Sequence, residues 1–272
     1  MKLAVGYPWS SPFMFTPFVD STLNMRHPEG VEVKYFRGTG WCPARRHIDL
    51  CEQAIEWGAD LICIIGTDQV HPEDMLERLV QRWDEGCEVT AALVPVRGYV
   101  AWQDMKPFQP MAWRFKTETE MGTTEYRQYR SMDLDSDMIH VVKREDGDLV
   151  KANFIGSGVL MFHADHLLSI KKPWFYENII HEDQTRIANM DCTFVWRLQN
   201  EAFATLWVDT TIEVKHLHTF EIDDTYSERF ADWTKPGVGD PNVAVFNQPG
   251  AKGANGEKVI RRDLQHAEHS TV

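Results

Sequence analysis

Asp68 is the side chain whose position most clearly suggests chemistry. It follows a continuous apolar run at residues 60–65 and precedes a predicted helix start, so it should stand at the carboxyl end of a buried strand. Carboxylate oxygens are preferred ligands of Mg²⁺ and Mn²⁺, and such an ion would bridge the closely spaced charges of a diphosphate. The alternative is that Asp68 caps the following helix.

Asp191 is a second acid at the edge of a predicted element. It opens a helix, and one helical face continues from it through Phe194 and Leu198. An acid in this position serves either as a cap or as a positioned general base. Glu182 and Asp183, on a predicted loop upstream, form a rival acidic pair.

Basic side chains occur at two further places. His216 follows a short predicted strand and could complete a metal site with Asp68, while His218 is the competing choice. Arg45 and Arg46 fall in the first turn of a predicted helix, where positive charge opposes the helix dipole. This indicates a compensating anion, such as phosphate or carboxylate, although a solvated face is an equal alternative.

The elements that must position these residues alternate between strand and helix patterns, which predicts βαβ units and a mostly parallel sheet. The predicted strands are residues 3–7, 31–36, 60–65, 88–96, 153–162, 205–208 and 212–214. The predicted helices are residues 17–25, 44–57, 75–83, 166–170 and 191–201. Residues 98–151 suggest an insertion with some antiparallel strands, and the polar stretch after about residue 225 suggests an irregular tail.

The composition limits the class of protein. The 272 residues, 43% hydrophobic, suffice for one sizeable α/β domain. A net charge of -13 argues against nonspecific nucleic-acid binding as the main role. No apolar run approaches the roughly 18 residues of a membrane span, and the N-terminus does not read as a signal peptide. Five cysteines without a zinc spacing favour a cytoplasmic chain with reduced thiols.

Three signatures of other enzyme classes fail. The glycine pairs at residues 38–40 and 156–158 lack the spacing of dinucleotide or P-loop fingerprints. No Gly-x-Ser-x-Gly elbow occurs, so serine hydrolase chemistry has no local support.

A series of short motifs runs in a fixed order along residues 3–218. The motifs are Gly6-Tyr7-Pro8, Ala44-Arg45-Arg46, Gly58-Ala59-Asp60, Gly66-Thr67-Asp68-Gln69, Gly156-Ser157-Gly158, Pro173-Trp174-Phe175, Met190-Asp191 leading to Arg197, and Trp207-Val208-Asp209 leading to His216. In this order they resemble the GT-A glycosyltransferases, especially the family-two-like enzymes of bacteria and bacteriophages. The resemblance implies a Rossmann-like, mostly parallel sheet flanked by helices, with a small antiparallel portion and an irregular C-terminal tail.

The resemblance also implies an organisation and an activity. Residues 1–225 would form the GT-A domain, with a nucleotide-binding half at 1–97 and an acceptor-side half at 98–225, followed by an extension at 226–272. Such an enzyme moves a sugar from a UDP- or GDP-sugar to an acceptor hydroxyl with Mn²⁺ or Mg²⁺. The acceptor stays open among a modified DNA base, a protein and a glycan.

Roles for individual residues follow from the resemblance alone. It implies that the nucleotide-binding residues are Tyr7, Pro8, Arg45, Asp60, Thr67, Asp68 and Gln69. It implies that Asp68 and His216 bind the metal and that Asp191 is the catalytic base. The base role requires an inverting reaction, since in a retaining one Asp191 would orient the acceptor instead.

Two positions depart from the family pattern. Gly66 replaces the first Asp of Asp-x-Asp, which often contacts the ribose or a metal-bound water, and Met190 replaces the Glu that precedes Asp191. The first departure leaves open a homologue that binds a nucleotide or glycan without turnover. A nucleotidyltransferase is the other alternative, although residues 7–18 lack the Gly-rich basic loop that such enzymes usually need.

Overall fold

A computed structural model describes residues 1–9, 13–95, 112–115, 139–176, 178–179, 187–188 and 190–217. The chain divides into two compact units, which are considered separately. The first comprises residues 1–94 and 110–214, and the second comprises 95–109 and 215–272. Most of the predicted insertion at 98–151 and all of the predicted tail beyond residue 225 lie outside the described residues.

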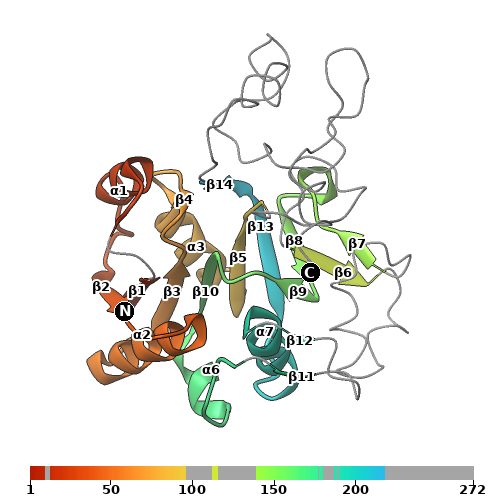
Figure 1. The fold of residues 1–272 in the computed structure, drawn as a ribbon. Coiled ribbons are helices and arrows are strands. Elements are labelled where there is room, and N and C mark those ends of the chain that lie inside the picture. The colour runs from red at the N-terminus through yellow and green to blue at the C-terminus, as the bar shows by residue number, and fades with distance from the viewer. Residues whose placement is uncertain are drawn as a thin grey trace, which may run out of the picture. The chain divides into compact units, whose positions relative to one another are not determined.

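The described part of the first unit is built on a seven-stranded sheet (Figure 1). In spatial order its strands are β2 (Glu32–Gly38), β1 (Lys2–Pro8), β3 (Leu61–Ile65), β10 (Val159–His163), β5 (Val89–Leu93), β13 (Leu206–Glu213) and β8 (Leu149–Ala152). β10 runs antiparallel to both of its neighbours and β8 runs antiparallel to β13, while the other strands share one direction. The prediction of a mostly parallel α/β sheet is confirmed.

Helices cover both faces of this sheet. Because successive strand residues point to opposite sides, their contacts show which face each helix covers. On β1, Gly6 lies against Leu50 of α2 (Pro43–Trp57), whereas the ring of Tyr7 contacts Phe18 of α1 (Thr16–Leu23). The same alternation places α7 (Met190–Asn200) on the α2 face and α3 (Met75–Asp84) on the α1 face. The sheet is therefore the middle layer of three.

The bounds of α2 follow from residues at its ends. Pro43 occupies the first turn, where its missing N–H is not needed, and Gly58 ends the helix in the left-handed region at φ 77°. Gly38 on β2 permits the close packing of this helix, since a Cβ there would lie 2.0 Å from the carbonyl oxygen of Arg46. These local choices fix α2 against β1 and β2.

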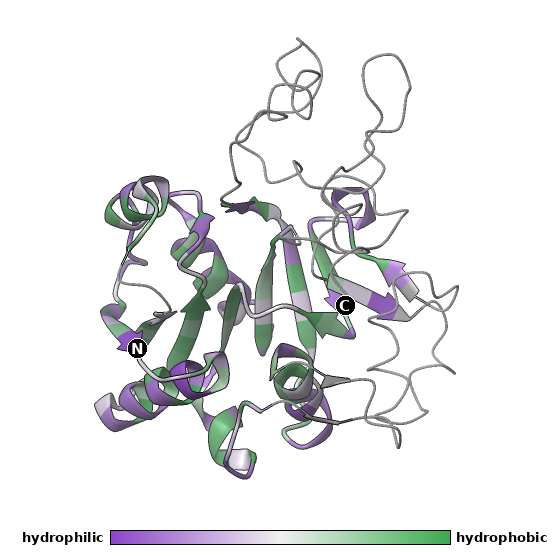
Figure 2. Ribbon diagram, in the orientation of Figure 1, coloured by the Kyte–Doolittle hydropathy of each residue, from purple (hydrophilic) through white to green (hydrophobic). Residues whose placement is uncertain are grey.

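The core lies between the sheet and its helices. All five residues of β3 are buried, as expected for a strand covered on both faces. Figure 2 shows the central strands in hydrophobic colours, while the helices carry hydrophilic residues on their outer surfaces. Burial of such apolar surface is the main favourable contribution to folding.

Two predicted strand boundaries are wrong. Residues 153–162 form two strands, β9 (Phe154–Ile155) and β10, because the Gly-Ser-Gly segment interrupts them. β9 belongs to a separate antiparallel sheet with β6 (Ala112–Phe115) and β7 (Ile139–Val141). Conversely, the two short strands predicted at 205–214 are one strand, β13, whose pairing with β5 shifts register between Asp209 and Glu213.

The remaining elements are short. They are β4 (Gln69–Val70), a 3₁₀ turn at Arg144–Asp146, α6 (Ala164–Ser169), the antiparallel pair β11 (Asn178–Ile179) and β12 (Ile187–Ala188), and, in the second unit, β14 (Lys215–His216). Among the described residues, no helix has the length and apolar character needed to cross a membrane.

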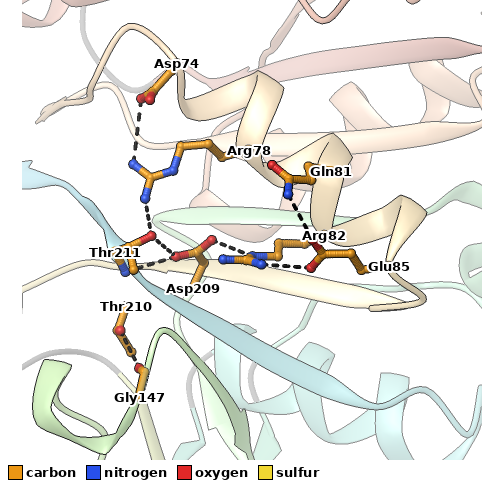
Figure 3. A network of polar contacts seen from close by, with 9 residues as sticks. All are labelled: Asp74, Arg78, Gln81, Arg82, Glu85, Gly147, Asp209, Thr210 and Thr211. Carbon is orange, nitrogen blue, oxygen red and sulfur yellow. Dashed lines mark hydrogen bonds and ion pairs between the residues drawn. The ribbon is translucent and has the colours of Figure 1, made fainter.

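A polar network ties α3 to the sheet (Figure 3). The fully buried carboxylate of Asp209 on β13 accepts from Arg82 Nε at 2.7 Å and from the backbone N–H of Thr211 at 2.9 Å. Arg82 also contacts Glu85 at 2.8 Å, and Arg78 bonds Thr211. A buried carboxylate is tolerated only when it is paired and hydrogen-bonded, so this network fixes how α3 sits on β13.

Replacing Asp209 by Ala tests this network. We expect the free energy of unfolding to fall by about 3–5 kcal/mol, because the substitution leaves the Arg82 guanidinium without its buried partner. The matched control is Glu85→Ala, which removes the exposed partner of the same arginine and should cost less than about 1 kcal/mol. Urea unfolding followed by circular dichroism measures both values, and equal losses would contradict the prediction.

Candidate functional site

The carboxyl end of β3 carries Asp68, as the sequence predicts. After Ile65 the chain leaves the sheet at Gly66, turns through Thr67 and the half-buried Asp68, and re-enters a strand at Gln69. The N–H of Gly66 donates to the carbonyl of Gly158 at 2.7 Å. This bond joins the end of β3 to the segment that precedes β10.

The side chain of Gln69 fills the space between two glycines. Gln69 is 2% exposed, and a Cβ would lie 2.7 Å from its Nε2 if built on Gly66 and 2.5 Å if built on Gly158. The added Cβ at Gly66 would also lie 3.2 Å from Asp68 Oδ1. The glycine that replaces the first Asp of Asp-x-Asp therefore leaves room for Gln69.

Gln69 also carries a polar atom that its protein surroundings do not satisfy. Its Oε1 is buried and receives no hydrogen bond within the described part of the chain. A buried acceptor without a donor costs on the order of 1–3 kcal/mol of folding free energy. The unsatisfied Oε1 of Gln69 therefore does not contribute to stability.

Asp191 lies at the same edge of the sheet. It is half-buried in the first turn of α7, and Ser157 Oγ donates to its Oδ1 at 2.7 Å. Ser157 stands between Gly156 and Gly158, so the same segment contacts both the Asp68 loop and Asp191. Ser157 was not predicted from the sequence, where its signal was a polar residue between two glycines directly before a buried strand.

His47 is another residue that the sequence analysis missed. It is 4% exposed at the start of the second turn of α2, where its Nδ1 bonds the carbonyl of Pro43 at 2.9 Å, and its ring lies 5.0 Å from that of Phe175. Burial lowers the pKa of the imidazole, and the charge of Asp191 acts in the opposite direction. His47 and Asp191 are thus close enough to interact electrostatically.

A buried arginine holds the loop that carries Phe175. Arg197 near the end of α7 donates to the carbonyls of Pro173 and Lys171, both at 2.5 Å, and pairs with Glu201 at 2.8 Å. The arginine of α7 thus binds the backbone at the start of the Pro-Trp-Phe motif. The loop in turn places Phe175 against the helix that bears Asp191.

The end of β1 carries Tyr7 and Pro8. The ring of Tyr7 is buried and stacks on Tyr35 at 6.0 Å, and burial raises the pKa of its phenol. Pro8 is half-buried beside Gly38 on β2. Both residues lie at the carboxyl ends of parallel strands, the edge that also bears the half-buried Thr67 and its neighbours.

The two arginines at the start of α2 have different partners. Arg45 is exposed and contacts Glu52 Oε2 at 3.3 Å, while Arg46 Nε donates to the carbonyl of Gly40 at 3.0 Å. The carboxylate of Glu52 provides negative charge that partly compensates the positive charge of Arg45. Because that ion pair is largely solvent-exposed, it holds Arg45 only weakly.

Asp60 is not brought together with the other predicted nucleotide-binding residues. It precedes β3, and its carboxylate accepts from the backbone N–H of Lys2 at 2.6 Å, at the amino ends of β1 and β3. The length of β3 separates this edge from Asp68 by roughly 20 Å. A carboxylate there is too far from the carboxyl edge to contact the same ligand, which corrects its predicted role.

His216 lies in the second unit, where its Nδ1 bonds the carbonyl of Pro95 at 2.8 Å. Its metal role remains a prediction. His218, Glu182 and Asp183 fall outside the described residues. Across the residues that the structure does describe, no three His, Cys, Asp or Glu side chains form a group that could hold a metal ion.

Comparisons with known structures include remote likenesses. No family model matches the sequence, and no curated protein sequence matches it. Protein A197 from STIV matches the fold with a TM-score of 0.47 and 12% identity, over 80% of this chain and 86% of that one.

Two structures of UDP-glucose pyrophosphorylase also match. The enzyme from Acinetobacter baumanii has a TM-score of 0.35 and 9% identity, over 70% of this chain and 56% of its own. An apo form has a TM-score of 0.37 and 8% identity, over 69% and 59%. This chain thus spans less than two thirds of either pyrophosphorylase, and all three likenesses are too distant to assign a function.

Replacing Gly66 by Ala tests the packing around Gln69. We expect a loss of about 1–3 kcal/mol in the free energy of unfolding, because the new Cβ overlaps the buried carboxamide. Combined with Gln69→Ala, which removes that carboxamide, the same substitution should cost less than about 0.5 kcal/mol. Urea unfolding of the two single variants and the double variant measures the coupling, and additive losses would show that the two residues do not conflict.

Proposed function

We propose that this protein is a glycosyltransferase that moves a sugar from a UDP- or GDP-sugar to an acceptor hydroxyl. The observation that carries the proposal is that two separately predicted acids lie at the same edge of the sheet. Gly66 beside Asp68 bonds Gly158, and the adjacent Ser157 bonds Asp191. Ligands of open α/β sheets bind at the carboxyl ends of the strands, which is this edge.

Asp191 is the proposed catalytic base. Ser157 holds one carboxylate oxygen, while a carboxylate has a second oxygen and further lone pairs that can accept the proton of an acceptor hydroxyl. In an inverting reaction Asp191 takes that proton as the hydroxyl attacks the anomeric carbon. In a retaining reaction the same hydrogen bonding orients the acceptor instead.

Asp68 is the proposed metal ligand, with Mn²⁺ or Mg²⁺ as the ion. A bound divalent ion supplies positive charge that stabilises the leaving diphosphate. Such ions are often held by one or two carboxylates together with substrate phosphates and water, so a full protein cage is not needed.

The donor nucleotide would lie at the ends of β1, β2 and β3. We assign nucleotide contacts to Pro8, Thr67 and Arg45, while the buried Gln69 packs beneath the Asp68 loop. The acceptor is a modified DNA base, a protein or a glycan, and the net charge of -13 mildly disfavours DNA.

Asp191→Asn tests the base role. With any UDP- or GDP-sugar that the wild type turns over, we expect transfer or donor hydrolysis to fall at least about 100-fold, because general base catalysis contributes on that order. Binding of the nucleotide, followed by calorimetry, should be retained. The control is Asp60→Asn, the same change at the opposite edge, which should leave turnover near that of the wild type.

Products separate the proposal from its rivals in the same assay. Release of free sugar or a glycosylated product supports transfer, whereas release of pyrophosphate would indicate a nucleotidyltransferase. Full activity of Asp191→Asn would exclude Asp191 as the base.

Asp68→Ala tests the metal role through binding rather than turnover. We expect UDP or GDP with MnCl₂ to raise the Tm of the wild-type protein more than nucleotide alone, since a ligand stabilises the state that binds it. The variant should lose this additional, metal-dependent increase in Tm. If the increase persists in the variant, Asp68 does not bind the ion.

A further inference from the structure

We infer that the carboxamide of Gln69 binds a sugar hydroxyl of the donor, with Oε1 accepting the hydrogen of that hydroxyl. This inference rests on the proposed function, in which a nucleotide sugar is the ligand at this edge of the sheet. It adds a neutral group to the two acids of the site. Gln69 takes no part in proton transfer and acts through binding alone.

The carboxamide of Gln69 lies between the carboxyl ends of two strands. A Cβ would lie 2.7 Å from its Nε2 if built on Gly66, just after β3, and 2.5 Å if built on Gly158, just before β10. The Cβ on Gly158 would also lie 3.2 Å from Cγ1 of Val94, which directly follows β5. The side chain therefore stands at the edge of the sheet where ligands of α/β proteins bind.

The surroundings of Oε1 provide no donor. Gln69 is 2% exposed, and its Oε1 receives no hydrogen bond from any residue that the structure describes. The nearby N–H of Gly66 is already bonded to the carbonyl of Gly158 at 2.7 Å, and the side chain of Val94 is apolar. Oε1 is thus a desolvated acceptor whose partner we assign to the ligand.

The chemistry of an amide oxygen selects the kind of group that it binds. An amide oxygen only accepts, so its partner must carry a hydrogen. In a nucleotide sugar the ionised diphosphate carries none, whereas the ribose and the transferred sugar, which are attached directly to it, carry hydroxyls. A sugar hydroxyl next to the diphosphate is therefore the group that suits Oε1.

The two glycines give a ligand access to this carboxamide. Gly66 and Gly158 are only half-buried, and neither has a side chain that would cover Gln69. Asp68 borders the same space, since its Oδ1 would lie 3.2 Å from a Cβ on Gly66. Glycines of this kind let a ligand approach the backbone closely. A diphosphate held through Asp68 would bring its attached sugars to Gln69.

Gln69→Met separates binding from stability. Methionine has a similar length but no amide oxygen, so we expect the Kd for UDP-glucose or GDP-glucose with MnCl₂ to rise about 10-fold or more. The Tm of the free protein should stay equal or rise, because the variant removes a buried acceptor that has no donor. Calorimetric titration and thermal unfolding measure the two quantities. Unchanged affinity in the variant would overturn the inference, whatever its Tm.

Deoxy analogues identify the hydroxyl in the same titrations. If the ribose supplies it, the wild type should bind the 2′-deoxy or 3′-deoxy form of UDP or GDP about 10-fold more weakly than the parent nucleotide. The variant should then bind parent and analogues alike. If the transferred sugar supplies it, the variant should bind the nucleoside diphosphate as the wild type does and only the nucleotide sugar more weakly. Weaker binding of the nucleoside diphosphate by the variant, without discrimination of the deoxy forms by the wild type, would indicate a contact to the base and overturn the inference.

The matched control is Gln81→Met, the same change at an exposed position of α3, where Gln81 bonds only Glu85 among the described residues. Its Kd and Tm should stay near those of the wild type. Sugar transfer by a Gln69→Met protein of unchanged affinity would overturn this inference while the proposed function stands. If the wild type binds neither nucleotide nor nucleotide sugar, the proposed function fails and the inference fails with it.

Discussion

The contact between Gly66 and Gly158 around the side chain of Gln69 is the constraint on which the candidate site depends. A Cβ on either glycine would overlap the carboxamide of Gln69, so the two glycines leave room for this buried side chain between them. Their hydrogen bond joins the Asp68 loop to the segment that holds Asp191 through Ser157. The two acids share one edge because of this approach.

The direction of β10 makes this arrangement possible. In a parallel sheet every strand begins at the amino edge, so a residue just before a strand lies far from the ligand-binding edge. β10 runs antiparallel between β3 and β5, and its beginning therefore stands beside the end of β3. Ser157, just before β10, therefore lies at the carboxyl edge. A parallel strand in the same place would have put it at the amino edge.

Buried polar groups take different parts within the first unit. Away from the site, Asp209 and Arg197 are buried charges with several hydrogen-bonding partners, and both fix packing between elements. At the site, Gln69 keeps a buried acceptor without a donor and His47 is held neutral by burial.

The sequence by itself determined the alternation of strands and helices, the buried character of β3, the bounds of α2 to within one residue, and the place of Asp68 after a strand. Each of these follows from local periodicity or from backbone preferences of single residues. Strand direction did not follow, because apolar alternation has the same period in parallel and antiparallel strands. The resemblance implied that Asp60 binds the nucleotide, but Asp60 precedes β3 and therefore lies at the amino edge of the sheet. The hydrogen bond from Ser157 to Asp191 and the burial of His47 became visible only in the tertiary structure, since contacts between residues distant in sequence leave no local pattern.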